Sequence, residues 1–153
     1  MKKIAGFLIF LLCLFSAKAQ QPVIVSPHWL NDNLNNPSLV LLDTGFIVRA
    51  DFDREHIEGS RFLWPEWLAL NTPEANMVSV NAKTATKVLQ NLGINKQSMI
   101  VICHKGSDVT IAARMFLALE HFGLKGQVSF LNGGIEAWKK AGYPVSNKTS
   151  VYK

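Results

Sequence analysis

Short apolar runs alternate along this chain with longer segments in which apolar residues recur at the spacing of a helix. A short, continuous apolar run is typical of a strand buried in a parallel sheet. The segments that predict strands span 23–25, 39–42, 61–63, 99–102 and 127–131. The segments that predict helices span 27–34, 82–92, 109–123 and 135–141, with a charged turn or short helix at 51–55. Because strands and helices alternate, the pattern predicts an α/β domain with a mainly parallel sheet.

Capping residues mark several of these helix ends. Ser26 followed by Pro27 is an N-terminal signal, and Asn81 is another. Gly93 and Gly142 stand where the pattern of their helices stops, and glycine is the usual residue just past a helix. The boundaries of these helices are therefore predicted as well as their existence.

The segment 99–123 is the part of the pattern that indicates chemistry. Its apolar strand ends at Cys103, a polar loop containing Gly106 follows, and an amphipathic helix completes it. Open parallel sheets place ligand sites at the carboxyl ends of their strands. There, unpaired backbone N–H groups and the helix dipole stabilise negative charge, including a thiolate. We therefore interpret Cys103 as the working residue of the chain.

Residues 1–19 have the three parts of a secretory signal. Lys2 and Lys3 precede an apolar run over 4–15, and Ala17-Lys18-Ala19 forms a small-x-small cleavage site. The apolar run is shorter than the ~18 to 20 residues that span a membrane. The sequence therefore predicts a cleaved signal, a periplasmic or secreted protein and no stable membrane anchor after cleavage. The predicted organisation is a signal at 1–19, a leader at 20–25, one domain at 26–146 and a polar tail at 147–153.

Composition fits one globular domain and gives no indication of nucleic-acid binding. The chain has 153 residues, of which 48% are hydrophobic and 18% charged. Its formal charge of +5 includes Lys2, Lys3 and Lys18 of the predicted signal, so cleavage leaves 13 basic residues against 11 acidic ones, a charge of +2. Without a basic surface interleaved with aromatic residues, we expect no nucleic-acid partner.

Cysteine usage leaves one thiol in the expected mature protein. Signal cleavage removes Cys13, so Cys103 stands alone and no internal disulfide can form. A lone Cys is often a buried structural residue. In an oxidising compartment, however, an exposed one is a liability unless it has a function. The loop around Cys103 decides between these interpretations.

Other polar residues have weaker claims to a functional role. Asp43, at the end of a predicted strand, fits a structural hydrogen-bonding role better than catalysis. A His that ties a turn together is the favoured interpretation of His56, with a general base as the alternative. The four histidines show no metal-ligand spacing with acidic residues or Cys103, and no Gly-rich phosphate motif is present. We expect neither a metal nor a cofactor.

Four phrases of the sequence, over about 25–145, resemble the rhodanese (thiosulfate:cyanide sulfurtransferase) domain. They are LVLLD (39–43), HIEGS (56–60), VIC followed by HKG (101–106) and LNGGIEAWKKAGYPV (131–145). The last is the most specific, because the family closes with a nearly identical D-G-G-x-x-x-W-x-x-x-G-x-P-V phrase. The resemblance implies a rhodanese-like fold, a five-stranded, mainly parallel sheet flanked by helices on both faces, with the cysteine loop over the strand ends.

The resemblance also implies a persulfide mechanism. The thiolate of Cys103 would take a sulfane sulfur from a small anionic donor, thiosulfate or a related species, and hand it to cyanide or a thiol. This chemistry needs a thiolate, so we expect a pKa below the value of about 8.5 of a free thiol. The available causes are Lys105, the backbone N–H groups of residues 104–109 and the dipole of the following helix.

The loop after the cysteine matches a C-R-K-G-V-T version of the family's active loop at Lys105, Gly106 and Thr110, and Gly106 lets the backbone curl around an anion. Two features depart from that version: His104 replaces its Arg, and 107–108 resembles an insertion. The family often places an Arg two residues after the Asp of the first strand; here Arg49 is the candidate for that charge. The predicted anion-binding residues are His104, Lys105, Gly106, Ser107, Asp108, Val109, Thr110 and Arg49. Asp108 is alternatively the N-cap of the following helix.

Two alternatives to an enzyme remain open. One is a catalytically inactive rhodanese-like module that binds or carries sulfur, and the other is a thiol redox protein. A rhodanese-fold phosphatase is disfavoured, because no Arg occupies the C-x5-R position and Arg114 lies inside the predicted helix.

Overall fold

The structure is a computed structural model that describes residues 20–44, 49–106 and 109–148. The predicted signal at 1–19, the loop residues Ser107 and Asp108, and most of the predicted tail lie outside the described residues. Within the described ranges, no helix combines the length and the apolar character needed to cross a membrane.

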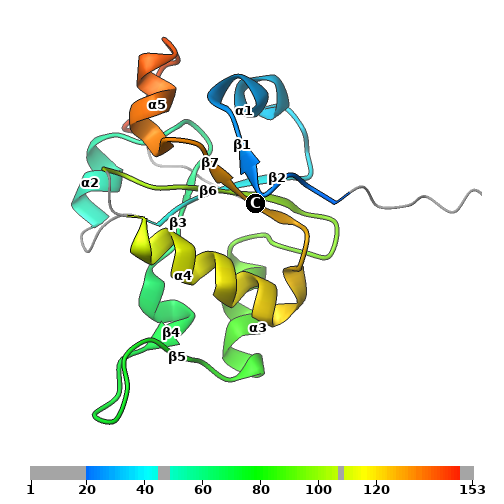
Figure 1. Ribbon diagram of the computed structural model, residues 1–153, viewed down its shortest axis with the longest axis vertical. Helices are drawn as coiled ribbons and strands as arrows, with labels where there is room; N and C mark the ends of the chain where they lie inside the picture. The colour runs from blue at the N-terminus through cyan, green and yellow to red at the C-terminus, as the bar shows by residue number, and fades with distance from the viewer. Residues whose placement is uncertain (1–19, 45–48, 107–108, 149–153) are drawn as a thin grey trace, which may run out of the picture.

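A parallel sheet forms the centre of the molecule, with strand order β1-β7-β6-β2-β3 (Figure 1). All four pairings are parallel, and β2 and β6 are joined over their whole length from Leu39↔Met99 to Asp43↔Cys103. The five strands are β1 (Ile24–Val25), β2 (Leu39–Asp43), β3 (Arg61–Phe62), β6 (Met99–Cys103) and β7 (Val128–Leu131). The predicted α/β class and five-stranded parallel sheet are confirmed.

Helices cover both faces of this sheet. One face carries α1 (Pro27–Asn33) and α5 (Gly134–Lys140), and the other carries α3 (Ala82–Asn91) and α4 (Thr110–Leu119) (Figure 1). The short α2 (Arg49–Arg54) lies beside β3, where Phe52 packs on Phe62 with 5.4 Å between ring centroids.

Alternation along the central strands decides which side chains face which helices. Ile100 and Ile102 of β6 belong to the apolar cluster under α3 and α4. Val101 and Cys103 belong to the cluster under α1 and α5, because successive strand residues point to opposite faces. The thiol of Cys103 is therefore directed toward α5.

The predicted caps are present. The Ser26 side chain accepts a hydrogen bond from Trp29 N, and that of Asn81 accepts one from Thr84 N, each of which satisfies an N–H that the helix itself cannot use.

The helix after the cysteine loop is shorter than predicted. The sequence pattern extends it to residue 123, whereas α4 ends at Leu119 and a wider π-helical turn, η2 (Glu120–Leu124), follows. Gly123 has a φ of 93°, a left-handed conformation that ends regular helix.

The region between β3 and α3, for which the sequence pattern predicts neither strand nor helix, contains regular structure. A 3-10 turn, η1 (Pro65–Trp67), precedes a small antiparallel pair, β4 (Ala69–Leu70) and β5 (Val78–Ser79). Arg114 of α4 donates to the carbonyl of Met77, so this pair is tied to the main domain.

Candidate active site

Cys103 ends β6 at the point where the strand order reverses. The chain leads from β2 outward to β3, and from β6 outward in the opposite direction to β7. The carboxyl ends of β2 and β6 thus form the switch point at which open α/β sheets bind ligands. Asp43 is the register partner of Cys103 there, and Thr44 N donates to the Cys103 carbonyl at 3.2 Å.

The thiol of Cys103 is fully buried, with 0% of the residue exposed. It packs in the cluster that contains Ile57, Ile135 and Trp138. Burial is the main cause that raises the pKa of Cys103 well above that of a free thiol. The charges of Asp43 and Glu136 raise it further, while Lys105 lowers it. The expected low pKa is therefore wrong for this closed arrangement: desolvation outweighs the nearby cation.

The loop after Cys103 is held by its backbone. The carbonyl of His104 accepts a hydrogen bond from Ile135 N at 3.0 Å and lies 3.8 Å from the Cys103 sulfur, which donates to it. The His104 ring nitrogen Nδ1 lies 3.1 Å from the Gly106 carbonyl oxygen. Gly106 has a φ of 70°, so the loop has the left-handed turn expected at this glycine.

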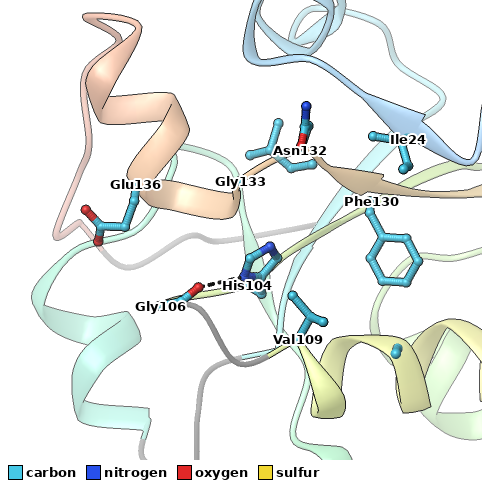
Figure 2. Close-up of a pocket in the computed structure, with 10 residues that line it drawn as sticks. Ile24, His104, Gly106, Val109, Phe130, Asn132, Gly133 and Glu136 are labelled. Carbon is cyan, nitrogen blue, oxygen red and sulfur yellow. Dashed lines mark hydrogen bonds between the residues drawn. The ribbon is translucent and has the colours of Figure 1, made fainter.

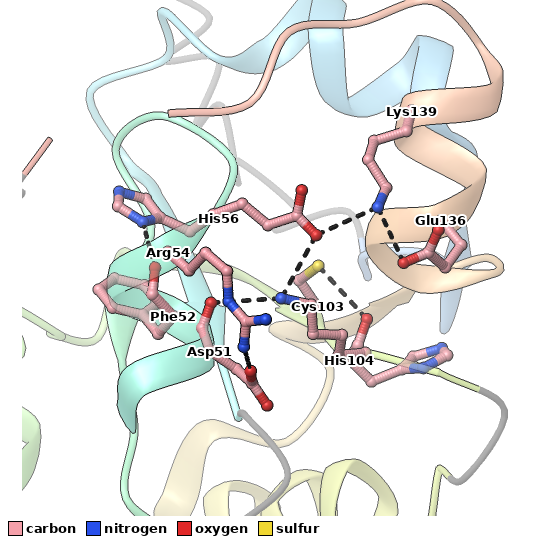
Figure 3. Close-up of polar contacts among 10 residues, drawn as sticks. Asp51, Phe52, Arg54, His56, Cys103, His104, Glu136 and Lys139 are labelled. Atoms are coloured by element: carbon pink, nitrogen blue, oxygen red, sulfur yellow. Dashed lines mark hydrogen bonds and ion pairs between the residues drawn. The ribbon is translucent and has the colours of Figure 1, made fainter. Parts of the chain in front are cut away.

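Lys105 extends from the loop toward α2. Its Nζ donates to the Asp51 carbonyl at 3.2 Å and lies 3.4 Å from Oε1 of Glu55. The same Glu55 oxygen lies 3.1 Å from Nζ of Lys139, and Lys139 also pairs with Glu136 at 3.0 Å. In Figure 3, the Cys103 thiol lies between Lys139 and Glu136 of α5 and Asp51 of α2. We call Lys105, Glu55, Lys139 and Glu136 the charge network.

The ion pairs of the charge network shift the pKa values of Glu55 and Lys139 in opposite directions. The hydrogen bond from Lys139 is the largest cause that lowers the pKa of Glu55; burial opposes it, and the charges of Lys105 and Lys139 add to the lowering. Hydrogen bonds to Glu136 and then Glu55 raise the pKa of Lys139. Glu55 and Lys139 are thus both charged at neutral pH.

Three further predicted site residues, Val109, Thr110 and Arg49, lie at the start of α4 and in α2. Val109 is the N-cap residue of α4 and has no capping side-chain bond, and Thr110 begins the helix. Arg49 pairs with Asp53 at 3.3 Å and its guanidinium lies over the Phe62 ring. Arg49 is therefore engaged within α2 and at β3, and no contact described for it joins the charge network.

An open pocket of about 710 Å³ adjoins the loop on the side of the His104 ring (Figure 2). Its walls are mainly apolar, and Cys103 is not among the described residues that line it. The lining residues are Ile24, His104, Gly106, Val109, Ala113, Phe130, Leu131, Asn132, Gly133 and Glu136. Glu136 thus belongs to both the pocket and the charge network.

His56 has the structural role favoured by the sequence. It is 1% exposed, its Nδ1 lies 2.7 Å from the Phe52 carbonyl oxygen, and its ring stacks on that of Phe52. Its backbone exchanges two hydrogen bonds with Ser146, which ties the C-terminal segment to the turn after α2.

Sequence reasoning missed the acidic and basic partners of the loop. The sequence places Glu55 in a charged turn and both Glu136 and Lys139 in the closing phrase, and it predicts no site role for any of the three. The spacing of Glu136 and Lys139, three apart on one helix, was a usable signal for their ion pair. Nothing local in the sequence indicated that Glu55 meets both lysines. Among the described residues, no three His, Cys, Asp or Glu side chains gather as a metal site would require.

Comparison with known proteins assigns the family. The family model described as "Rhodanese-like domain" matches residues 26–141. Thiosulfate sulfurtransferase of Rattus norvegicus is 28% identical over 139 residues, covering 83% of this chain and 46% of that protein. The same-named protein of Azotobacter vinelandii is 26% identical over 130 residues, covering 85% and 46%. The chain thus spans about half the length of these curated relatives.

Solved structures agree on the fold. SseA of Escherichia coli, from a study of 3-mercaptopyruvate sulfotransferases, superposes with a TM-score of 0.73 at 21% identity, covering 86% of this chain and 52% of that one. A 3-mercaptopyruvate sulfurtransferase from Leishmania major gives 0.72 at 17% identity, covering 85% and 38%. With the family match, the parallel sheet and the cysteine at its switch point, this chain belongs to the rhodanese-like domain family.

Proposed function

We propose that this protein is a sulfurtransferase that moves a sulfane sulfur from thiosulfate or a related donor to cyanide or a thiol through a persulfide on Cys103. The observation that carries the proposal is the position of Cys103, at the switch point of the sheet and beside the Lys105 ammonium group. Similarity to thiosulfate sulfurtransferases supports the reaction class.

The proposed reaction has two displacements. The Cys103 thiolate attacks the outer sulfur of thiosulfate, a new S–S bond forms, and the bond to the sulfonate sulfur breaks, so that sulfite leaves with the electron pair. Cyanide then attacks the outer sulfur of the persulfide, which gives thiocyanate and returns the thiolate. Positive charge from Lys105 favours the thiolate and the persulfide anion over their neutral forms.

The burial of Cys103 adds a requirement to this mechanism. With the thiol fully covered and its pKa raised, a donor reaches the sulfur only after the loop or the charge network moves. The same movement admits water to the thiol and so reduces the desolvation that holds its proton.

The same burial favours a second candidate, a rhodanese-like module that carries or binds sulfur without turnover. The third interpretation, a thiol redox protein, requires the thiol to react with disulfides rather than with sulfane donors.

Turnover with thiosulfate and cyanide tests the enzyme. We expect thiocyanate release by the wild-type protein and none above background by Cys103→Ser. Equal rates for the two proteins would end the enzyme interpretation. A single sulfur added to Cys103 without thiocyanate release would favour the carrier, and a mixed disulfide with glutathione disulfide but no persulfide would favour the redox protein.

We also propose that the chain acts after export, in the periplasm or outside the cell, on the signal pattern of residues 1–19. Fractionation of expressing cells tests this, because an exported chain begins near Gln20 and leaves the cytoplasmic fraction. A chain that keeps its first 19 residues in that fraction would contradict it.

A further inference from the structure

Glu55 shares one carboxylate oxygen between the two lysines of the charge network. Oε1 of Glu55 lies 3.4 Å from Nζ of Lys105 and 3.1 Å from Nζ of Lys139. Its side chain is 29% exposed and those of the lysines are 23% and 33%, so the contacts are sheltered from water more than a surface pair would be. Glu55 therefore neutralises cations that an anionic donor would otherwise meet.

The four charges of the charge network sum to zero. Two ammonium groups, those of Lys105 and Lys139, face the carboxylates of Glu55 and Glu136 in the charge network. Asp43 adds a further negative influence from the neighbouring strand, since its charge raises the pKa of the thiol. A dianionic donor at this position is attracted less strongly than it would be by two lysines without carboxylate partners. A monoanionic donor has half the charge, so the carboxylates reduce its attraction by half as much.

Resting on the proposed function, we propose that Glu55 is a specificity-determining residue, which masks Lys105 and Lys139 and thereby favours sulfur donors with one negative charge over donors with two. The class of donor is a monoanion that carries a transferable outer sulfur. Glu55 acts through the two lysines and needs no contact with the donor.

Two donors of nearly equal size isolate the charge. Thiosulfate is a dianion, and methanethiosulfonate replaces one of its anionic oxygens with a methyl group. In both, the Cys103 thiolate attacks the outer sulfur and the electron pair leaves with the sulfonyl sulfur, as sulfite or as methanesulfinate. Cyanide regenerates the thiolate and yields thiocyanate in both cases, so one assay reads both donors.

The test compares kcat/KM for the two donors in the wild type and in Glu55→Gln, which keeps the shape of the side chain and removes its charge. Since Coulomb energy is proportional to the donor's charge, we expect a rise of about tenfold with thiosulfate and about threefold with methanethiosulfonate. Glu58→Gln, an exposed carboxylate of the same turn, is the matched control and changes neither value. An equal change for both donors, or a fall in the preference for thiosulfate, overturns the proposal.

A second measurement separates this proposal from the sulfurtransferase function. Iodoacetate is an anion and iodoacetamide is neutral, and both alkylate Cys103 without any sulfur transfer. We expect the ratio of the iodoacetate rate to the iodoacetamide rate to rise about threefold in Glu55→Gln. Absence of thiocyanate with every donor would end the proposed function, whereas an unchanged alkylation ratio would end the role of Glu55.

Discussion

Gly134, the first residue of α5, packs closely against His104 of the cysteine loop, and replacing Gly134 with Ala tests that contact. Gly134 has a φ of 58°, and an added Cβ would lie 3.0 Å from both Cε1 and Nδ1 of the His104 ring and nearer still to the His104 carbonyl oxygen. That carbonyl accepts the bond from Ile135 N and lies against the Cys103 sulfur. The substitution therefore displaces the segment that covers the thiol.

The magnitude follows from three contributions. Ala in the left-handed region costs about 1 to 2 kcal/mol, of which reduced freedom of the unfolded chain offsets about 0.4 to 1 kcal/mol. Crowding against a packed backbone adds about 1 to 3 kcal/mol, and weakening the bond from Ile135 N to His104 adds about 1 kcal/mol. We expect Gly134→Ala to lower the free energy of unfolding by about 4 kcal/mol in all.

Urea unfolding measures this loss, with Gly142→Ala as the matched control. Gly142 also has a positive φ, of 84°, but nothing lies within 4 Å of its added Cβ. The control therefore carries the backbone strain alone, and we expect a loss of about 1 kcal/mol. Losses that agree within about 0.5 kcal/mol, near the usual effect of surface substitutions, would show that Gly134 is not needed for close approach to His104.

Two further predictions concern the charge and the proton of the site. We expect Lys105→Ala to lower kcat/KM for thiosulfate by about fivefold to tenfold and to leave iodoacetamide labelling at high pH nearly unchanged. Lys140→Ala, on the exposed side of α5, is its control. Unaltered thiosulfate kinetics in Lys105→Ala would show that Lys105 is not part of the site. The raised pKa of Cys103 means that the unfolded chain releases a thiol proton above pH ~8.5 while the folded chain keeps it. The free energy of unfolding of the wild type should therefore fall relative to that of Cys103→Ala as pH rises above this value, by up to about 1.4 kcal/mol per pH unit. Parallel pH profiles of the two proteins would contradict the raised pKa.

Elements with strong local signals were predictable from the sequence. The apolar runs of β2 and β6 are long enough to indicate buried parallel strands. Ser26 and Asn81 are residues typical of N-caps, and they predict the starts of α1 and α3. By contrast, the end of α4 depends on Gly123, whose neighbours continue the helical pattern, so periodicity extended the helix too far.

The position of Cys103 was predictable, but its surroundings were not. A strand followed by a loop and a helix indicates where a thiol stands in a sheet. The sequence carries no signal for the depth at which Ile57, Ile135 and Trp138 bury that thiol, since these residues come from two distant segments. The charge network has the same origin: Glu55 and Lys139 are 84 positions apart, and only the folded chain brings them together.

Intact-protein mass spectrometry tests most directly whether Cys103 carries sulfur as a persulfide. After incubation with thiosulfate and removal of excess donor, we expect a mass gain of one sulfur atom that peptide mapping assigns to Cys103. Cyanide should remove that sulfur with release of an equal amount of thiocyanate. A wild-type protein that gains no sulfur from thiosulfate or methanethiosulfonate, or a Cys103→Ser variant that gains the same mass, would contradict a persulfide on Cys103.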